Sequence, residues 1–253
     1  MKQKASFVFL LIMFTGATAI AQDAERNATG IVRDALNHWR GLSSHGVMTM
    51  TIHRLDWKRT MSMESWSEGE KLSLVQVTEP RKDRGNATLI NNNRMWTFSP
   101  KINRVIKVPS SMMNQSWMGS DFSNKDISRT DDMVEQYDHT LLSTSEMDEH
   151  VVFEIESIPH EDAAVVWGRE VLKIREDNVM IEQHFYDQDD VLVKSLKTLD
   201  IREIGGRSVA ARQRMSKAEM PDEWTEISID SIEFDVELGD NVFTLSNLRN
   251  PRN

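Results

Sequence analysis

Residue types that commonly support catalysis are present in this sequence, but they do not form a recognisable catalytic motif. The seven histidines include no His-Glu-x-x-His pair, and the absence of cysteine excludes thiolate nucleophiles and cysteine-ligated zinc sites. A Gly-x-Ser-x-Gly nucleophile motif is also absent. The acidic run at residues 187–190 lacks the glycine and the distal glutamate of a calcium-binding loop, so it predicts an exposed hairpin turn. The sequence therefore predicts no catalytic residue, no cofactor and no bound metal ion.

Side chains that could bind an apolar ligand are more prominent, and they are concentrated in a connecting segment, residues 99–126. Five large apolar side chains of this segment lie outside any helical or strand periodicity: Met112, Met113, Trp117, Met118 and Phe122. Loops are normally polar, because an exposed apolar patch promotes aggregation. The segment is therefore expected either to cover an apolar interior or to present apolar surface to a ligand.

Methionines also alternate with polar residues between positions 48 and 64. A hairpin that turns between residues 55 and 56 would place two methionine pairs opposite each other on one face: Met48 with Met63, and Met50 with Met61. Methionine adapts to irregular apolar shapes, so this ladder either fills a core or lines a binding surface. If the ladder lines a binding surface, replacement of Met50 or Met63 by aspartate would abolish retention of an apolar ligand. If the ladder fills a core, the same replacement would abolish folding.

The elements that must position these side chains are mostly strands. Val32, Leu36 and Trp39 predict a helix over residues 22–40 that stops at Gly41. A short helical interruption is expected at residues 131–137. Period-two patterns predict strands at 48–52, 60–64, 72–77, 87–90, 95–98, 105–108, 141–143 with extensions on both sides, 151–155, 171–175, 179–186, 191–201, 209–215 and 225–236.

The last predicted strand changes phase. Ile227 and Ile229 share one parity whereas Ile232 and Phe234 share the other, so we expect a β-bulge at residues 230–231. Many short strands with few helices indicate a mostly β (α+β) fold. We expect one strongly curved antiparallel sheet or an incomplete barrel, with helices and a loop closing its mouth or concave face.

The N-terminus predicts export. Lys2 and Lys4 precede an apolar run, and a small-residue site ends at Ala21, which is the pattern of a cleaved signal peptide over residues 1–21. An uncleaved membrane anchor is the competing interpretation. Residues 22–253 are expected to form one domain held together by packing, since no disulfide is available.

The charge balance limits the partners. The full chain carries a net charge of −10, and removal of residues 1–21, which include two lysines and no acidic residue, brings this to about −12. Nucleic acid and anionic lipid headgroups would be repelled by such a surface at long range. Basic patches on protein partners would be attracted.

Three stretches resemble a known family. They are Met95-Trp96-Thr97-Phe98-Ser99-Pro100 with Arg104-Val105, Ser116-Trp117-Met118-Gly119-Ser120-Asp121-Phe122 with Asp126, and the ending Asn241-Val242-Phe243-Thr244-Leu245-Ser246-Asn247-Leu248. Together they resemble the outer-membrane lipoprotein-sorting protein branch of the LolA/LolB-like superfamily, over essentially the whole mature chain. The resemblance implies an unclosed antiparallel barrel whose helices form a lid over an apolar cavity that receives acyl chains.

The resemblance also implies a periplasmic carrier of a lipid or lipoprotein, which works between membrane-bound donor and acceptor proteins, one of them an RND-type transporter of the inner membrane. The lid element is expected at residues 110–122, with Gly119 as its hinge. Asp121 and Asp126 are expected to fix this loop through hydrogen bonds rather than to bind cargo. Candidate cavity or lid residues are Met48, Met50, Met61, Met63, Leu72, Leu74, Trp96, Met112, Met113, Trp117, Met118 and Phe122. Replacement of Trp117 by alanine is expected to speed release of cargo with little loss of stability.

Two alternatives come from other functional classes. A periplasmic regulatory sensor that binds a membrane signalling protein would use the same fold, but such a sensor usually carries a second domain and no domain boundary is evident. A lipid hydrolase would require carboxylates or a histidine, and ester hydrolysis by variants of His53 and His184 would test it.

Overall fold

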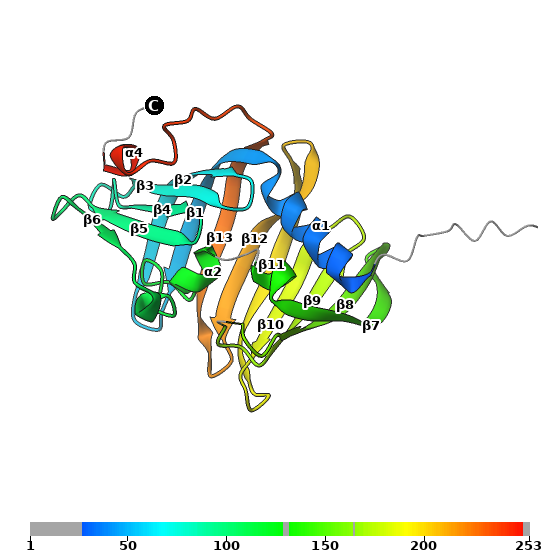
Figure 1. Ribbon diagram of the computed structural model, residues 1–253. Helices are drawn as coiled ribbons and strands as arrows, with labels where there is room; N and C mark the ends of the chain where they lie inside the picture. The colour runs from blue at the N-terminus through cyan, green and yellow to red at the C-terminus, as the bar shows by residue number, and fades with distance from the viewer. Residues whose placement is uncertain (1–26, 129–131, 164, 250–253) are drawn as a thin grey trace, which may run out of the picture.

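A single antiparallel sheet accounts for most of the chain in the computed structural model, which describes residues 27–128, 132–163 and 165–249 (Figure 1). Within these residues thirteen strands pair in the order β6-β5-β4-β3-β2-β1-β13-β12-β11-β10-β9-β8-β7. The end strands β6 and β7 are not paired with each other in the described part of the chain, so the curved sheet is an incomplete barrel, as the sequence predicts. The expected signal peptide, residues 1–21, lies outside the described residues.

The strands are β1 (Ser43–His53), β2 (Lys58–Glu68), β3 (Leu72–Glu79), β4 (Ala87–Asn91), β5 (Arg94–Ser99), β6 (Arg104–Lys107), β7 (Tyr137–Met147), β8 (His150–Pro159), β9 (Arg169–Arg175), β10 (Met180–Tyr186), β11 (Leu192–Ile204), β12 (Arg207–Lys217) and β13 (Met220–Phe234). The helices are α1 (Ala28–Arg40), the 3-10 helix η1 (Ser110–Met112), α2 (Asn124–Ser128), α3 (Asp132–Glu135) and α4 (Leu245–Arg249). All of the predicted strands are present, and most of them are longer than the ranges that the sequence pattern predicts.

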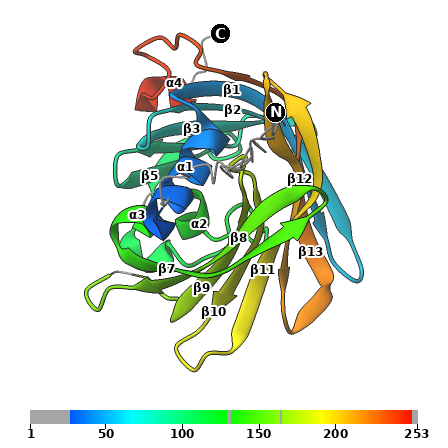
Figure 2. The same ribbon diagram turned by 90° about the vertical axis from the view of Figure 1, so that its right-hand side faces the viewer.

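Helix α1 lies across the concave side of the sheet with α2 and α3 (Figure 2). The side chain of Asn27 caps its start by accepting a hydrogen bond from the Gly30 amide at 2.7 Å. Gly41 ends it with a φ of +66°, a conformation that suits glycine. Val32 and Leu36 are buried against the sheet, as the helical stripe predicts, whereas Trp39 is 38% exposed.

The first hairpin has the predicted register. Met48 pairs with Met63 and Met50 with Met61 across β1 and β2. The predicted bulge is also present, because Val47 pairs with Ser231 while the next residue, Met48, pairs with Ile229. Residue 230 is therefore the extra residue of β13, and the break in pairing lets the long strand bend.

Both faces of the first half of the sheet are covered. The concave face carries a cluster of Met50, Met61, Met63 and their neighbours. The opposite face is covered by the C-terminal segment, where Phe243 and Leu248 pack against β3, β4 and β5. Among the described residues, no helix combines the length and the hydrophobicity that crossing a membrane requires.

Candidate functional site

A cavity of about 340 Å³ lies between the concave face of the sheet, helix α1 and the segment 108–128. This volume is at the lower end of the range for small-molecule sites. Most of the wall is apolar and comes from elements far apart in sequence. The apolar lining residues include Leu36, Trp39, Met48, Val75, Trp117, Phe122, Val179, Phe185, Leu196, Val209, Met215 and Ile227.

The methionine ladder contributes to this region in two ways. Met50, Met61 and Met63 are at most 1% exposed and pack into the core below the cavity. Met48 is only partly buried, and it lines the cavity wall. One methionine of the ladder therefore faces the cavity, while the other three support the wall as core residues.

Three buried residues, Trp117, Ser120 and Phe122, anchor the segment 108–123, whereas residues 109–112 and 114–116 are exposed. Trp117 is 2% exposed, and its indole N–H donates a hydrogen bond to Thr88 Oγ1 on β4 at 3.0 Å. Ser120 Oγ donates to the Trp117 carbonyl at 2.7 Å, which closes a turn in which Met118 and Gly119 have positive φ angles of 52° and 80°. This burial argues against the expectation that replacement of Trp117 by alanine costs little stability.

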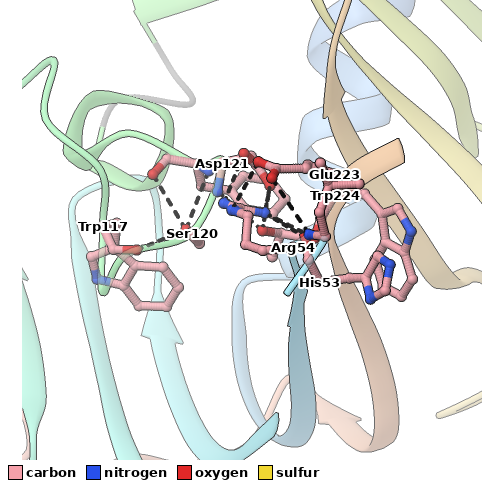
Figure 3. A network of polar contacts seen from close by, with 10 residues as sticks. His53, Arg54, Trp117, Ser120, Asp121, Glu223 and Trp224 are labelled. Atoms are coloured by element: carbon pink, nitrogen blue, oxygen red, sulfur yellow. Dashed lines mark hydrogen bonds and ion pairs between the residues drawn. The ribbon is translucent and has the colours of Figure 1, made fainter. Parts of the chain in front are cut away.

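A buried ion pair ties the segment to the sheet (Figure 3). Arg54, at the end of β1, donates two hydrogen bonds to the two carboxylate oxygens of Asp121, at 3.0 and 3.1 Å. Thr225 Oγ1 on β13 donates to Asp121 at 2.7 Å and accepts from the Asp121 amide at 3.0 Å. The side chains of Arg54 and Asp121 are 14% and 4% exposed, so Asp121 fixes the loop, as the sequence predicts.

The remaining candidates divide between two faces. Met113 and Met118 are partly buried against the concave-face cluster, and Met112 is 40% exposed at the surface of the segment. Leu72, Leu74 and Trp96 pack with the C-terminal segment on the opposite face. These last three do not line the cavity. Strand alternation places them on the face away from Val75 and Met95, and the sequence alone could not tell which face curls inward.

Polar side chains gather on one part of the cavity wall. Glu170 on β9 is 3% exposed, and it accepts hydrogen bonds from Tyr137 Oη at 2.8 Å and from Gln183 Nε2 at 2.6 Å. Loss of hydration on burial raises the pKa of Glu170 to about 7, although both hydrogen bonds oppose the rise. The strand pattern gave no sign of this residue, since a single glutamate in a strand usually faces solvent.

A second ion pair adjoins this carboxylate. Lys194 on β11 is 5% exposed, and its Nζ lies 2.5 Å from Asp126 Oδ2. The ammonium also lies over the rings of Trp167 and Phe185, at 4.9 and 4.7 Å from their centroids. Asp126 exchanges hydrogen bonds with Ser123 at the start of α2, which confirms its predicted role in fixing the loop.

The two histidines of the hydrolase alternative lie away from the cavity lining. His53 stacks on Trp224 with ring centroids 4.9 Å apart. Desolvation lowers the pKa of His184, and its Nε2 lies 3.9 Å from Glu182 Oε2. Among the described residues, neither histidine side chain forms a hydrogen bond with a serine or threonine that it could activate.

Several solved structures are similar to this chain over most of its length. A DUF1329 family protein from Desulfovibrio piger has a TM-score of 0.79 and 25% identity, covering 87% of this chain and 97% of its own. A putative outer membrane lipoprotein-sorting protein domain from Vibrio parahaemolyticus has a TM-score of 0.77 and 22% identity, with 90% and 100% coverage. A LolA superfamily protein from Nitrosomonas europaea has a TM-score of 0.71 and 22% identity, with 87% and 98% coverage.

A family model also matches the sequence. It is described as "Uncharacterized protein" and matches residues 69–250, which is well over half of the chain. No curated protein sequence matches significantly. The chain belongs to the family of that model, and it shares the fold of the lipoprotein-sorting protein domain and of the LolA superfamily protein.

Proposed function

We propose that this protein is a periplasmic carrier that encloses acyl chains of a lipid or lipoprotein in its apolar cavity and transfers them between membrane partners. The observation that carries the proposal is the cavity itself, walled by Met48, Phe185 and Met215 from the sheet, Leu36 from α1 and Trp117 from the covering segment. A soluble protein rarely keeps such an apolar space unless a ligand fills it.

The energetics of acyl chains explain why a carrier is needed. Each methylene group transferred out of water contributes roughly 0.8 kcal/mol, so a chain of about sixteen carbons would cost on the order of 10 kcal/mol to expose. A carrier must therefore enclose the chain and still open to load and unload it. The unpaired edges of the sheet and the covering helices are elements that could separate without breaking the strand ladder.

The partners are proposed from family membership and charge. A membrane-bound donor and a membrane-bound acceptor would deliver and receive the acyl chains, and one of them would be an inner-membrane transporter of the RND type. The net charge of −10 favours basic docking surfaces on these partners. No nucleic acid is expected to bind.

A fluorescent fatty-acid analogue tests the proposal directly. Wild-type protein should take up the analogue with an increase in fluorescence, and Met48→Asp should abolish uptake because it places a charge on the apolar wall. Met147→Asp is the matched control, since Met147 is 47% exposed on the edge strand β7. Circular dichroism would establish that both variants are folded. Equal uptake by the two folded variants would contradict the proposal.

A further inference from the structure

Two charged side chains lie on either side of a phenylalanine across three neighbouring strands of the concave face, and one of them, Glu170, lines the cavity. Glu170 on β9 pairs with Phe185 on β10, and Phe185 pairs with Lys194 on β11. Residues directly opposite each other in an antiparallel sheet share a face, so these side chains lie side by side on the concave surface. The adjacent row, from Gln183 through Leu196 to Met215, is polar only at Gln183. Glu170 and Gln183 thus form a polar region in a largely apolar wall, which also includes the polar side chains of His38, Asn178 and Gln213.

The charges of this polar region do not cancel when Glu170 is ionised. Lys194 already pairs with Asp126 at 2.5 Å. Among the described residues, the side chains that donate to Glu170 are both neutral, the hydroxyl of Tyr137 and the amide of Gln183. Glu170, Lys194 and Asp126 together thus carry a net charge of −1. Lys125 also lines the cavity and, like Asp126, it is partly exposed, so solvent screens its charge more than that of the buried Glu170.

Such a region discriminates between the polar ends of acyl chains. A carboxylate has two oxygens that together can accept about four hydrogen bonds, and Glu170 receives two from the protein. A ligand N–H or O–H can supply another. A ligand carboxylate can supply none and would bring a second uncompensated negative charge into a buried site.

We propose that Glu170, with Tyr137 and Gln183, forms a head-group subsite that selects acyl chains ending in an uncharged hydrogen-bond donor, an amide or a hydroxyl, over chains ending in a free carboxylate. This inference rests on the proposed acyl-chain carrier function and specifies its ligand class. The apolar body of the cavity holds the chain, and the subsite holds its polar end.

Three ligands of equal chain length test the subsite: dodecanamide, methyl dodecanoate and dodecanoate. Each is titrated against wild-type protein loaded with an apolar fluorescent probe, and displacement of the probe gives the relative affinity. Because burial raises the pKa of Glu170 to about 7, measurement at about pH 8.5 keeps its carboxylate ionised. We expect dodecanamide to bind more tightly than dodecanoate by a factor of about ten or more. The ester should have an intermediate affinity, because it is neutral but cannot donate a hydrogen bond.

A matched pair of variants assigns the effect to Glu170. Glu170→Gln should reduce the preference for the amide to within about threefold, since the variant is neutral and nearly isosteric. Glu182→Gln is the control: Glu182 precedes Gln183 and so lies on the opposite face, where it pairs with Lys173 and Lys197. The control should keep the wild-type preference.

The outcomes separate the two proposals. Equal binding of dodecanamide and dodecanoate by wild type would overturn the subsite and leave the carrier function intact. Displacement by none of the three ligands would overturn both. Full discrimination by Glu170→Gln would overturn the role of Glu170. The comparison of ligands on wild-type protein needs no variant, so it decides the question even if Glu170→Gln does not fold.

Discussion

Replacement of Trp117 by alanine should lower the free energy of unfolding by about 3 to 5 kcal/mol, the range for truncating a buried aromatic residue. The indole is 2% exposed, and it packs in the cluster that contains Met50 and Met63. Alanine would remove these contacts and leave a space beside the existing cavity. It would also remove the donor to Thr88, a buried hydroxyl, and so contribute about 1 kcal/mol of that loss.

Urea unfolding followed by circular dichroism measures this loss, because the signal of the sheet does not depend on the removed indole. Trp57→Ala is the matched control: Trp57 is 46% exposed in the turn between β1 and β2, so its removal should cost less than about 1 kcal/mol. A loss below about 1 kcal/mol for Trp117→Ala would refute the reasoning. It would restore the view that residues 110–122 form a loosely attached lid.

Three further predictions concern buried polar groups and the core. Asp121→Asn should cost about 1.5 to 3 kcal/mol in urea unfolding, because it removes the two short charge-assisted hydrogen bonds of the ion pair and leaves Arg54 with the more distant Glu223 carboxylate at 3.5 Å; a loss below about 0.5 kcal/mol would contradict the ion pair. Glu170 has a folded pKa of about 7 against an ordinary value of 4.5, so its contribution to stability is present below about pH 4.5 and is lost as the pH rises to about 7. This loss amounts to about 3 kcal/mol, and Glu170→Gln should remove it; parallel stability-pH curves for the two proteins would refute the assignment. Met50→Asp should yield no folded protein by circular dichroism, since Met50 is fully buried, and a folded variant that merely loses lipid would show instead that Met50 faces the cavity.

Local sequence patterns predicted the sheet well. The register of the first hairpin followed from the alternation of Met48 and Met50 with threonine, and the bulge at residue 230 followed from the change of parity between Ile229 and Ile232. In both cases one face of the strand is buried, so a slip by one residue would move apolar side chains to the wrong face. Such patterns fix pairing without any knowledge of the partner strands.

The cavity could be predicted only in part, because its wall is assembled from distant elements. Met48, Trp117 and Phe122 were predicted candidates and line it. Leu72, Leu74 and Trp96 were assigned to the wrong face, since alternation identifies two faces of a strand but does not tell which one a curved sheet encloses. Helices were expected to close the concave face, but the α1 residues that line the cavity, such as Leu36 and Trp39, could not be predicted, because the packing of a helix against strands far along the chain is set by tertiary structure.

The polar subsite had no sequence signal at all. Glu170 and Lys194 occur in strands, where charged residues normally face solvent, and only their burial distinguishes them. Gln183, which donates to Glu170, is partly buried. Their partners, Tyr137 and Asp126, lie 33 and 68 residues away along the chain from Glu170 and Lys194. Residues that meet only through strand pairing and the packing of α2 do not form a motif that spacing can reveal.

Native mass spectrometry of the protein purified gently from its own cells, followed by extraction and identification of any bound lipid, tests the proposed carrier function most directly. We predict a stoichiometric acylated molecule that dissociates only under activating conditions. Protein that is consistently empty, and that also fails to take up a fluorescent fatty acid, would contradict it.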